Sequence, residues 1–199
     1  MDKKYNNPKI TINKVYTRKG DDGFTSLVGG KKIKKNTERV CGFGEIDELN
    51  VMLGLCTTNN QIKKLEIKNH IISIQNDLFN LGNMLATPEE HMSSKNPQIT
   101  ENSIYFLENH IDVYNERLDS LSSFVLPGGS KLSIDFHIAR VVCRRCERLV
   151  VSINENNNAD LIIIKYLNRL SDLLFVWSRY SNFILGVKEV LWNPNYKEN

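Results

Sequence analysis

The side chains best suited to chemistry lie within residues 140–148, which read Arg-Val-Val-Cys-Arg-Arg-Cys-Glu-Arg. At about 100° per residue, a helix gathers five polar side chains of this region on one face, namely His137, Arg140, Arg144, Glu147 and Arg148. The opposite side is apolar, with Ile138, Val142, Cys146 and Leu149, and Arg145 lies at the margin. Guanidinium groups stay charged and donate paired hydrogen bonds to phosphate oxygens, so this face favours a polyphosphate ligand. The alternatives are a solvated basic surface and an Arg–Glu network between helices.

A second group of polar residues lies in the glycine-rich segment 17–35. Its four glycines, at positions 20, 23, 29 and 30, predict turns whose backbone amides approach an anion closely. Hydroxyls and positive charges accompany them, from Thr17, Arg18, Lys19, Thr25, Ser26, Lys31 and Lys35. The spacing matches neither a P-loop nor the calcium loop of an EF-hand. The segment is therefore either an anion-binding loop or a flexible basic arm.

Two smaller patterns complete the candidates. Within residues 165–179 one helical face is polar and either lines a site or faces solvent; it carries Lys165, Asn168, Asp172 and Arg179. Cys143 and Cys146 form a Cys-x-x-Cys pair inside the arginine-rich helical pattern. A zinc site would need two further ligands in a second cluster, and a redox pair normally opens a helix after a strand. We therefore interpret both cysteines as buried thiols.

The elements that must position these residues are predicted to be helices. Apolar residues at helical spacing indicate five of them, over residues 41–57, 61–86, 100–118, from Ser130 to about Asn154, and 161–185. Thr100 and Ser130 are the expected N-caps, and a loop (87–98), a tight linker (124–130) and a polar break (154–158) connect the helices. The predicted fold is an all-α, five-helix bundle with a glycine-rich N-terminal loop. We expect a single domain over residues 1–199, with a flexible N-terminus (1–14), a nucleotide-binding loop (15–36), the bundle (37–187) and an irregular tail (188–199).

Composition narrows the class of protein. A chain of 199 residues, 41% hydrophobic and 25% charged, is typical of a globular domain with a substantial core. The net charge of +3 does not by itself indicate a nucleic-acid partner, and no apolar run reaches the length of a membrane span. The first 14 residues lack the apolar region of a secretory signal. We therefore expect a cytoplasmic location by default, with a mitochondrial one open if a presequence has been removed.

Five motifs in combination resemble the propanediol-utilisation type of ATP:cob(I)alamin adenosyltransferase. They are Tyr-Thr-Arg-Lys-Gly-Asp-Asp-Gly-Phe-Thr-Ser (16–26), Gly-Glu-Ile-Asp-Glu-Leu-Asn (44–50), Phe-Val-Leu-Pro-Gly-Gly (124–129), the arginine segment (140–148) and Tyr-Leu-Asn-Arg-Leu-Ser-Asp-Leu-Leu-Phe (166–175). The resemblance extends from Val15 to about Leu185. It implies a five-helix bundle that works as a homotrimer, with ATP held between adjacent subunits. It also implies transfer of the adenosyl group of ATP to the cobalt of reduced cobalamin, with release of triphosphate.

The resemblance assigns roles to individual positions. It implies an ATP loop formed by Thr17, Arg18, Lys19, Gly20, Thr25, Ser26 and Lys35. It implies further ATP contacts from Arg144, Arg145, Glu147, Arg148 and Asn168. Catalytic roles fall to Arg144, to Arg140, which orders the site across the interface, and to Phe124, which crowds the lower face of the corrin. Magnesium is expected on the phosphates, with its protein ligands unknown.

Some partners and alternatives stay open. Several relatives carry an acid, able to pair with an interface arginine, just after the residue matching Lys35; this chain has Asn36 and Thr37, which leaves that pair open. A flavoprotein reductase and an adenosylcobalamin-dependent enzyme are the expected partners, with no nucleic acid and no membrane. The alternative function is a non-catalytic trimeric helical scaffold that binds nucleotide or nucleic acid, although an RNA binder would add exposed aromatic residues beside the arginines. A cobalamin carrier is a third option.

Overall fold

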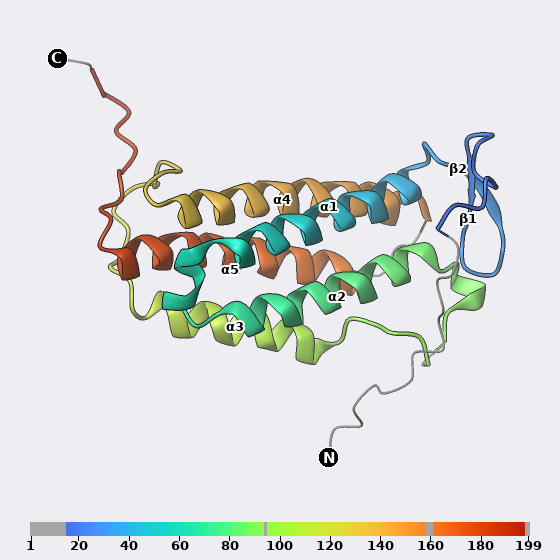
Figure 1. Ribbon diagram of the computed structural model, residues 1–199, viewed down its shortest axis with the longest axis horizontal. Coiled ribbons are helices and arrows are strands. Elements are labelled where there is room, and N and C mark those ends of the chain that lie inside the picture. The colour runs from blue at the N-terminus through green and yellow to red at the C-terminus, as the bar shows by residue number, and fades with distance from the viewer. Residues whose placement is uncertain (1–14, 94, 158–160, 198–199) are drawn as a thin grey trace.

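The computed structural model describes residues 15–93, 95–157 and 161–197. Five long helices dominate these ranges, as Figure 1 shows: α1 (Glu38–Thr58), α2 (Lys68–Ala86), α3 (Glu101–Asn115), α4 (Lys131–Asn157) and α5 (Leu161–Leu185). The predicted all-α, five-helix bundle is confirmed. Within the described ranges, none of the helices has the apolar length that crossing a bilayer requires.

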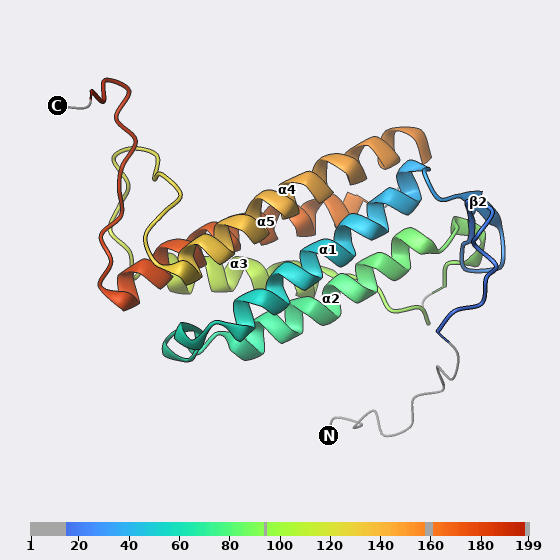
Figure 2. The same ribbon diagram turned by 45° about the horizontal axis from the view of Figure 1, so that its top comes forward.

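Helix α5 supplies much of the core. It packs along α4 and α3, while α1 packs against α4 and α2 (Figure 2). Because it has neighbours on several sides, α5 is buried over most of its circumference, and its Tyr166 and Trp177 are among the largest fully buried side chains. Burial of each large apolar side chain contributes about 1.5–3 kcal/mol, so this helix fixes the frame on which α4 presents its arginines.

The predicted helix over residues 61–86 is wrong over its first seven residues. The chain there forms a short 3₁₀ helix, η1 (Asn60–Lys64), and then turns before α2 begins at Lys68. Glu66 adopts a left-handed backbone (φ 58°), which a continuous helix excludes. The apolar spacing misled because Ile62 and Leu65 are buried by the 3₁₀ helix and the turn after it. The apolar spacing therefore continued across the turn between α1 and α2 and did not mark where α2 begins.

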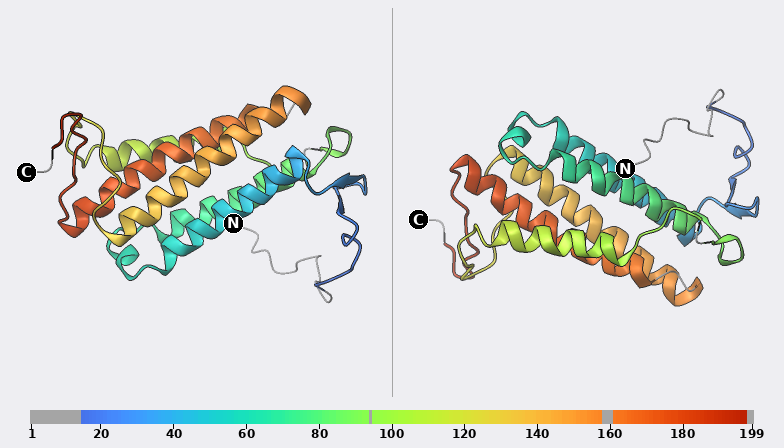
Figure 3. Two further views of the ribbon diagram at one scale, coloured as in Figure 1. Left: turned by 90° about the horizontal axis from the view of Figure 1, so that it is seen from above. Right: turned by 90° about the horizontal axis from the view of Figure 1, so that it is seen from below.

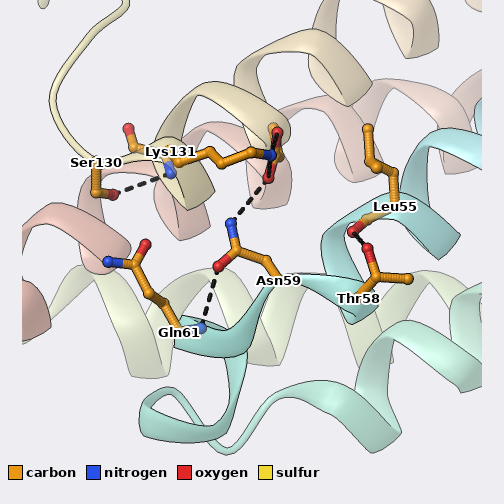
Figure 4. Close-up of polar contacts among 8 residues, drawn as sticks. Leu55, Thr58, Asn59, Gln61, Ser130 and Lys131 are labelled. Carbon is orange, nitrogen blue, oxygen red and sulfur yellow. Dashed lines mark hydrogen bonds and ion pairs between the residues drawn. The ribbon is translucent and has the colours of Figure 1, made fainter.

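A polar network joins this turn to the start of α4 (Figure 4). The buried carboxylate of Asp135 accepts a hydrogen bond from Asn59 Nδ2 at 2.9 Å and pairs with Lys131 Nζ at 3.2 Å. Ser130 caps α4, as predicted, because its Oγ accepts from the backbone N–H of Ser133 at 3.1 Å. The network fixes the register of α4 against α1.

Other boundaries differ by a few residues. Thr100 stands at the N-cap of α3 as predicted, whereas α3 ends at Asn115 rather than at residue 118. Helix α4 continues to Asn157, so residues 154–157 of the expected polar break are helical, and its last residue, 158, lies outside the described ranges. The loop expected over 87–98 contains a short 3₁₀ helix, η2 (Glu89–His91). These are the positions where helix ends fray and local sequence decides little.

The glycine-rich segment is more ordered than the predicted loop. It contains an antiparallel hairpin of β1 (Phe24–Ser26) and β2 (Lys32–Lys34), with Thr25 opposite Ile33. We call residues 17–35 the N-terminal hairpin. It projects beyond the ends of α1 and α2, at the opposite end of the bundle from the C-terminal tail (Figure 3). The N-terminal hairpin therefore lies at one end of the bundle and the C-terminal tail at the other.

Candidate active site

The arginine face lies on the outer side of α4. Arg144 and Arg148 are exposed there, and Arg148 Nη1 donates to the carbonyl of Arg144 at 3.1 Å. Beneath them the helix is apolar, as predicted, with Val142 and Cys146 buried. Ile138 is a correction, because it is exposed rather than packed. The buried arc is turned toward α5 and includes Phe136, Ala139, Cys143 and Val150, since α4 packs most closely along that helix.

The two cysteines of this helix are free thiols in the core, as predicted. Cys143 Sγ donates to the carbonyl of Leu167 and Cys146 Sγ to that of Glu45. Burial raises the pKa of the Cys146 thiol to about 12 and raises that of Cys143 well above its ordinary value. Both thiols therefore stay protonated at neutral pH.

Asn168 of α5 lies beside this face. Its Nδ2 donates to Glu147 Oε1 at 3.1 Å, and its Oδ1 accepts from Arg169 Nη1 at 2.6 Å. Arg169 in turn pairs with Glu108 of α3 at 2.9 Å. Burial raises the pKa of nearby Asp172, and the charge of Arg169 opposes that rise. Three helices thus hold Asn168 and Glu147 in one orientation next to Arg144.

Arg145 points elsewhere. Its Nε pairs with Glu45 of α1 at 2.6 Å, and its Nη2 pairs with Glu48 one turn further along. The hydrogen bonds to Glu48 and Glu45 raise the pKa of Arg145. The residue that the helical wheel placed at the margin therefore bridges α4 to α1, and this ion-pair network spans about a hundred residues of sequence.

The N-terminal hairpin is anchored on the end of α2. The N–H of Val28 donates to the carbonyl of Ala86 at 3.0 Å, and Leu27 is buried beneath the hairpin. Gly20 lies so close to Lys35 and Phe24 that an added Cβ would stand 2.9 Å from Lys35 Nζ and 3.2 Å from the Phe24 carbonyl. The remaining predicted loop residues are exposed or half-buried: Thr17, Arg18, Lys19, Thr25 and Ser26. The fold thus collects these groups at one end of the bundle.

Two predicted groups do not meet within one chain. Among the described residues, no hydrogen bond or ion pair joins the N-terminal hairpin to residues 140–148 or to Asn168. The hairpin instead forms hydrogen bonds within itself, with Thr37 just before α1 and with Ala86 at the end of α2. One chain alone therefore presents two separate basic surfaces.

A cavity of about 760 Å³ adjoins the arginine face at Arg140, toward the N-terminal end of α4. The residues that line it include Phe124, His137, Arg140, Phe175 and Trp192. Phe124 is 78% exposed, and its ring lies 6.2 Å from that of Trp192. His137 is only 5% exposed; burial, then the charge of Arg140, lowers its pKa to about 4. His137 Nδ1 and Arg140 Nε are buried without a hydrogen-bond partner among the described residues. The cavity is thus aromatic, with a neutral imidazole and a guanidinium in its wall.

Sequence reasoning brought Phe124, His137 and Arg140 forward but missed the other two aromatic residues of this wall, Phe175 and Trp192. Phe175 closes the last family motif, yet its apolar helix gave no reason to separate it from the core. Trp192 lies in the tail that was expected to be irregular. The short apolar run Val190-Leu191-Trp192 in the tail was the available signal. The predicted polar face of α5 is not one continuous surface. Arg179 is buried in an ion pair with Glu189, whereas Lys165 pairs with Glu101 on the exposed surface.

Comparison with known proteins identifies the class. The family model for cobalamin adenosyltransferase matches residues 15–181, and the chain belongs to this family. It is 39% identical over 181 residues to the cobalamin adenosyltransferase of Cupriavidus metallidurans, covering 91% of this chain and 95% of the relative. It is 40% identical over 179 residues to the corrinoid adenosyltransferase of Bacillus subtilis, covering 89% and 91%.

A solved structure gives the same assignment. A variant of the PduO-type ATP:corrinoid adenosyltransferase from Lactobacillus reuteri, complexed with cobalamin and ATP, superposes with a TM-score of 0.85 at 33% identity, covering 91% of this chain and 97% of that one. Family membership favours an adenosyltransferase over the alternative of a non-catalytic nucleotide-binding or nucleic-acid-binding scaffold.

Proposed function

We propose that this protein transfers the 5′-deoxyadenosyl group of ATP to the cobalt of cob(I)alamin and releases triphosphate. The observation that carries the proposal is the junction on α4 between an exposed guanidinium face and an aromatic cavity. Arg140 lines the cavity and stands four residues before Arg144 on α4, one helical turn away, so the two surfaces adjoin. A polyphosphate on one surface and a large apolar ring system in the other would meet at that junction.

The reaction does not require the protein to supply or activate a nucleophile. Cob(I)alamin is itself a strong nucleophile, so the protein must align the 5′ carbon of ATP with cobalt and stabilise the charge of the departing triphosphate. We assign the phosphates to Arg144 and Arg148, whose guanidinium groups are exposed. Glu147 and Asn168, already hydrogen-bonded to each other, are placed to orient the nucleoside. Arg145 would act through α1, by holding Glu45 and Glu48 against α4.

Phe124 would control the lower face of the corrin. An exposed aromatic ring in the wall of the cavity can occupy the space that the lower cobalt ligand needs. Loss of that ligand makes cob(II)alamin easier to reduce to the nucleophilic state. Phe175 and Trp192 extend the aromatic wall, and the neutral imidazole of His137 adds a hydrogen-bonding group without adding charge.

We further propose that the active unit is a homotrimer with ATP bound between subunits. The packed pair α1 and α4 exposes apolar side chains next to the arginine face, namely Val51, Leu55, Ile138 and Val141. Apolar groups gathered beside a functional surface favour an interface. A neighbouring chain seated there could bring its N-terminal hairpin to the arginine face, and this would unite the two basic surfaces.

Other components follow from the reaction. Mg²⁺ binds nucleotides mainly through phosphate oxygens and water with one or two carboxylates, so we propose that it accompanies ATP, with Glu147 the carboxylate on that face. An electron donor must generate cob(I)alamin, and a flavoprotein reductase is the class proposed for this step. An adenosylcobalamin-dependent enzyme would consume the product.

The decisive test is anaerobic incubation of the protein with ATP, Mg²⁺ and chemically reduced cobalamin. The visible spectrum should change to that of the adenosyl product, and triphosphate should appear in equal amount. Reactions without ATP or without protein are the controls. Formation of phosphate and pyrophosphate without any adenosyl product would contradict the proposal.

Binding of ATP should also protect the N-terminal hairpin from trypsin. Its exposed Arg18, Lys19 and Lys31 project from the end of the bundle, where little core holds them. We expect cleavage there in the free protein and a clear slowing at saturating ATP, measured by mass spectrometry of the fragments. The exposed Lys63 and Lys64 of η1 provide the internal control, because their cleavage should not respond to ATP. Equal cleavage of the hairpin in both states would argue against its role in binding.

A further inference from the structure

The tail after α5 forms an ordered segment, residues 187–192, which we call the C-terminal strap. The chain turns at Gly186, whose φ of 66° suits glycine, and Val187 N–H then donates to the carbonyl of Asn182 at 2.9 Å. The strap pairs antiparallel with the linker before α4, where Val125 lies opposite Leu191. The strap is therefore a partner of the segment that carries Phe124.

The hydrogen bonds of this pairing end on Phe124 and its neighbours. Trp192 N–H donates to the carbonyl of Phe124 at 2.7 Å, and Leu126 N–H donates to the carbonyl of Val190 at 2.8 Å. Ser123 Oγ donates to the carbonyl of Trp192 at 2.9 Å. Phe124 is 78% exposed, so packing of its own ring holds it weakly. The position of the Phe124 ring is therefore set mainly by the backbone hydrogen bonds between the strap and the linker.

A buried ion pair anchors the strap to α5. Arg179 is 6% exposed, and its Nε lies 3.1 and 3.3 Å from the two carboxylate oxygens of Glu189. Arg179 Nη2 also donates to the carbonyl of Asp119 at 2.9 Å. A buried guanidinium with these partners strongly disfavours any state in which Glu189 leaves it. The pair therefore ties the middle of the strap to the most buried helix of the bundle.

We propose that Arg179 and Glu189 are positioning residues for the corrin substrate. Their ion pair keeps the C-terminal strap docked, and the docked strap holds Phe124 and Trp192 in the wall of the 760 Å³ cavity. Neither residue lines that cavity, so they act through the strap. The proposal rests on the proposed function, because it assigns the corrin to this cavity.

Glu189→Gln tests the pair, and Glu101→Gln is the matched control because Glu101 pairs with Lys165 of α5 on the exposed surface. The first measurement needs no substrate. Of the two tryptophans, Trp177 is fully buried and Trp192 is 48% exposed, so acrylamide quenching of fluorescence reports mainly on the strap. We expect stronger quenching in Glu189→Gln and no change in Glu101→Gln.

The second measurement is steady-state adenosylation. We expect the KM for cobalamin to rise about tenfold in Glu189→Gln, equivalent to ~1.4 kcal/mol of corrin binding, with an unchanged KM for ATP. The electron paramagnetic resonance spectrum of bound cob(II)alamin with ATP should regain coupling to the lower nitrogen ligand. The double variant Arg179→Gln/Glu189→Gln, which leaves no buried charge without its partner, should behave in the same way.

The outcomes separate the two proposals. Two results overturn the positioning role alone. The first is an active Glu189→Gln protein whose acrylamide quenching equals that of the wild type. The second is increased quenching with an unchanged KM for cobalamin. A parallel rise in the KM values of both substrates, or loss of helical circular dichroism in both variants, assigns the pair to general stability and also overturns it. If the wild-type protein forms no adenosyl product, the proposed function fails, and the role toward the corrin fails with it.

Discussion

Replacing Arg144 with alanine should reduce adenosyl transfer by roughly a hundredfold or more, about 2.7 kcal/mol in transition-state stabilisation, without unfolding the protein. Arg144 is exposed on α4 and makes no ion pair with any described residue, so its removal leaves no charge unpaired. A charge-assisted hydrogen bond to phosphate contributes about 1.5–3 kcal/mol, and a guanidinium can donate two. The ratio kcat/KM measures the loss of adenosyl transfer, and the circular dichroism melting curve shows whether the variant stays folded.

Two further variants sharpen this result. Arg144→Lys should recover only part of the activity, because an ammonium group cannot reproduce the planar pair of donors. Arg117→Ala is the matched control, since Arg117 donates to the Tyr180 hydroxyl at 2.9 Å, away from the arginine face. Near-normal turnover in Arg144→Ala would contradict the assignment of the arginine face to the phosphates.

Two inactive variants should restore activity to each other when their subunits are mixed. Gly20→Pro disrupts the N-terminal hairpin where the backbone is crowded by Lys35 and Phe24, and Arg144→Ala disrupts the arginine face. In a site shared between chains, an intact hairpin from one subunit can meet an intact helix from its neighbour. Random reassembly would make roughly a quarter of the sites complete. Activity after co-expression or co-refolding is the measurement.

The controls for complementation are each variant refolded alone and a mixture with the double variant Gly20→Pro/Arg144→Ala. The double variant supplies no intact element, so it should restore nothing. Sedimentation at the assay concentration gives the oligomeric state independently. A monomer would contradict the trimer, and an inactive mixed trimer would place both basic surfaces of each site on a single chain.

The sequence predicted the helices wherever apolar spacing was long and uninterrupted. The bounds of α5 match the expected 161–185, because its apolar residues are buried along the whole length. The same signal failed at Ile62 and Leu65, which are buried by a short 3₁₀ helix and a turn rather than by an α-helix. The strands of the hairpin are three residues each, too short for alternation to show.

The site was predictable where it depends on one helix and not where it depends on distant partners. The polar face containing Arg144 follows from helical geometry alone. The ion pairs of Arg145 with Glu45 and Glu48 join residues about a hundred positions apart, which no local pattern encodes. Trp192 reaches the cavity only because the strap pairs with the linker, and backbone pairing leaves no mark in side-chain composition.

The burial of Cys143 and Cys146 has a consequence for the compatibility of this scaffold with its substrate. Thiolates are good ligands and reductants for metal centres, and a reactive thiol beside a corrin could bind cobalt or be consumed by oxidation. Both side chains point into the core beneath the arginine face, and burial holds the pKa of each far above neutrality. The helix that presents the arginine face thus keeps both of its thiols buried and protonated, so neither sulfur atom is available to bind or reduce the cobalt.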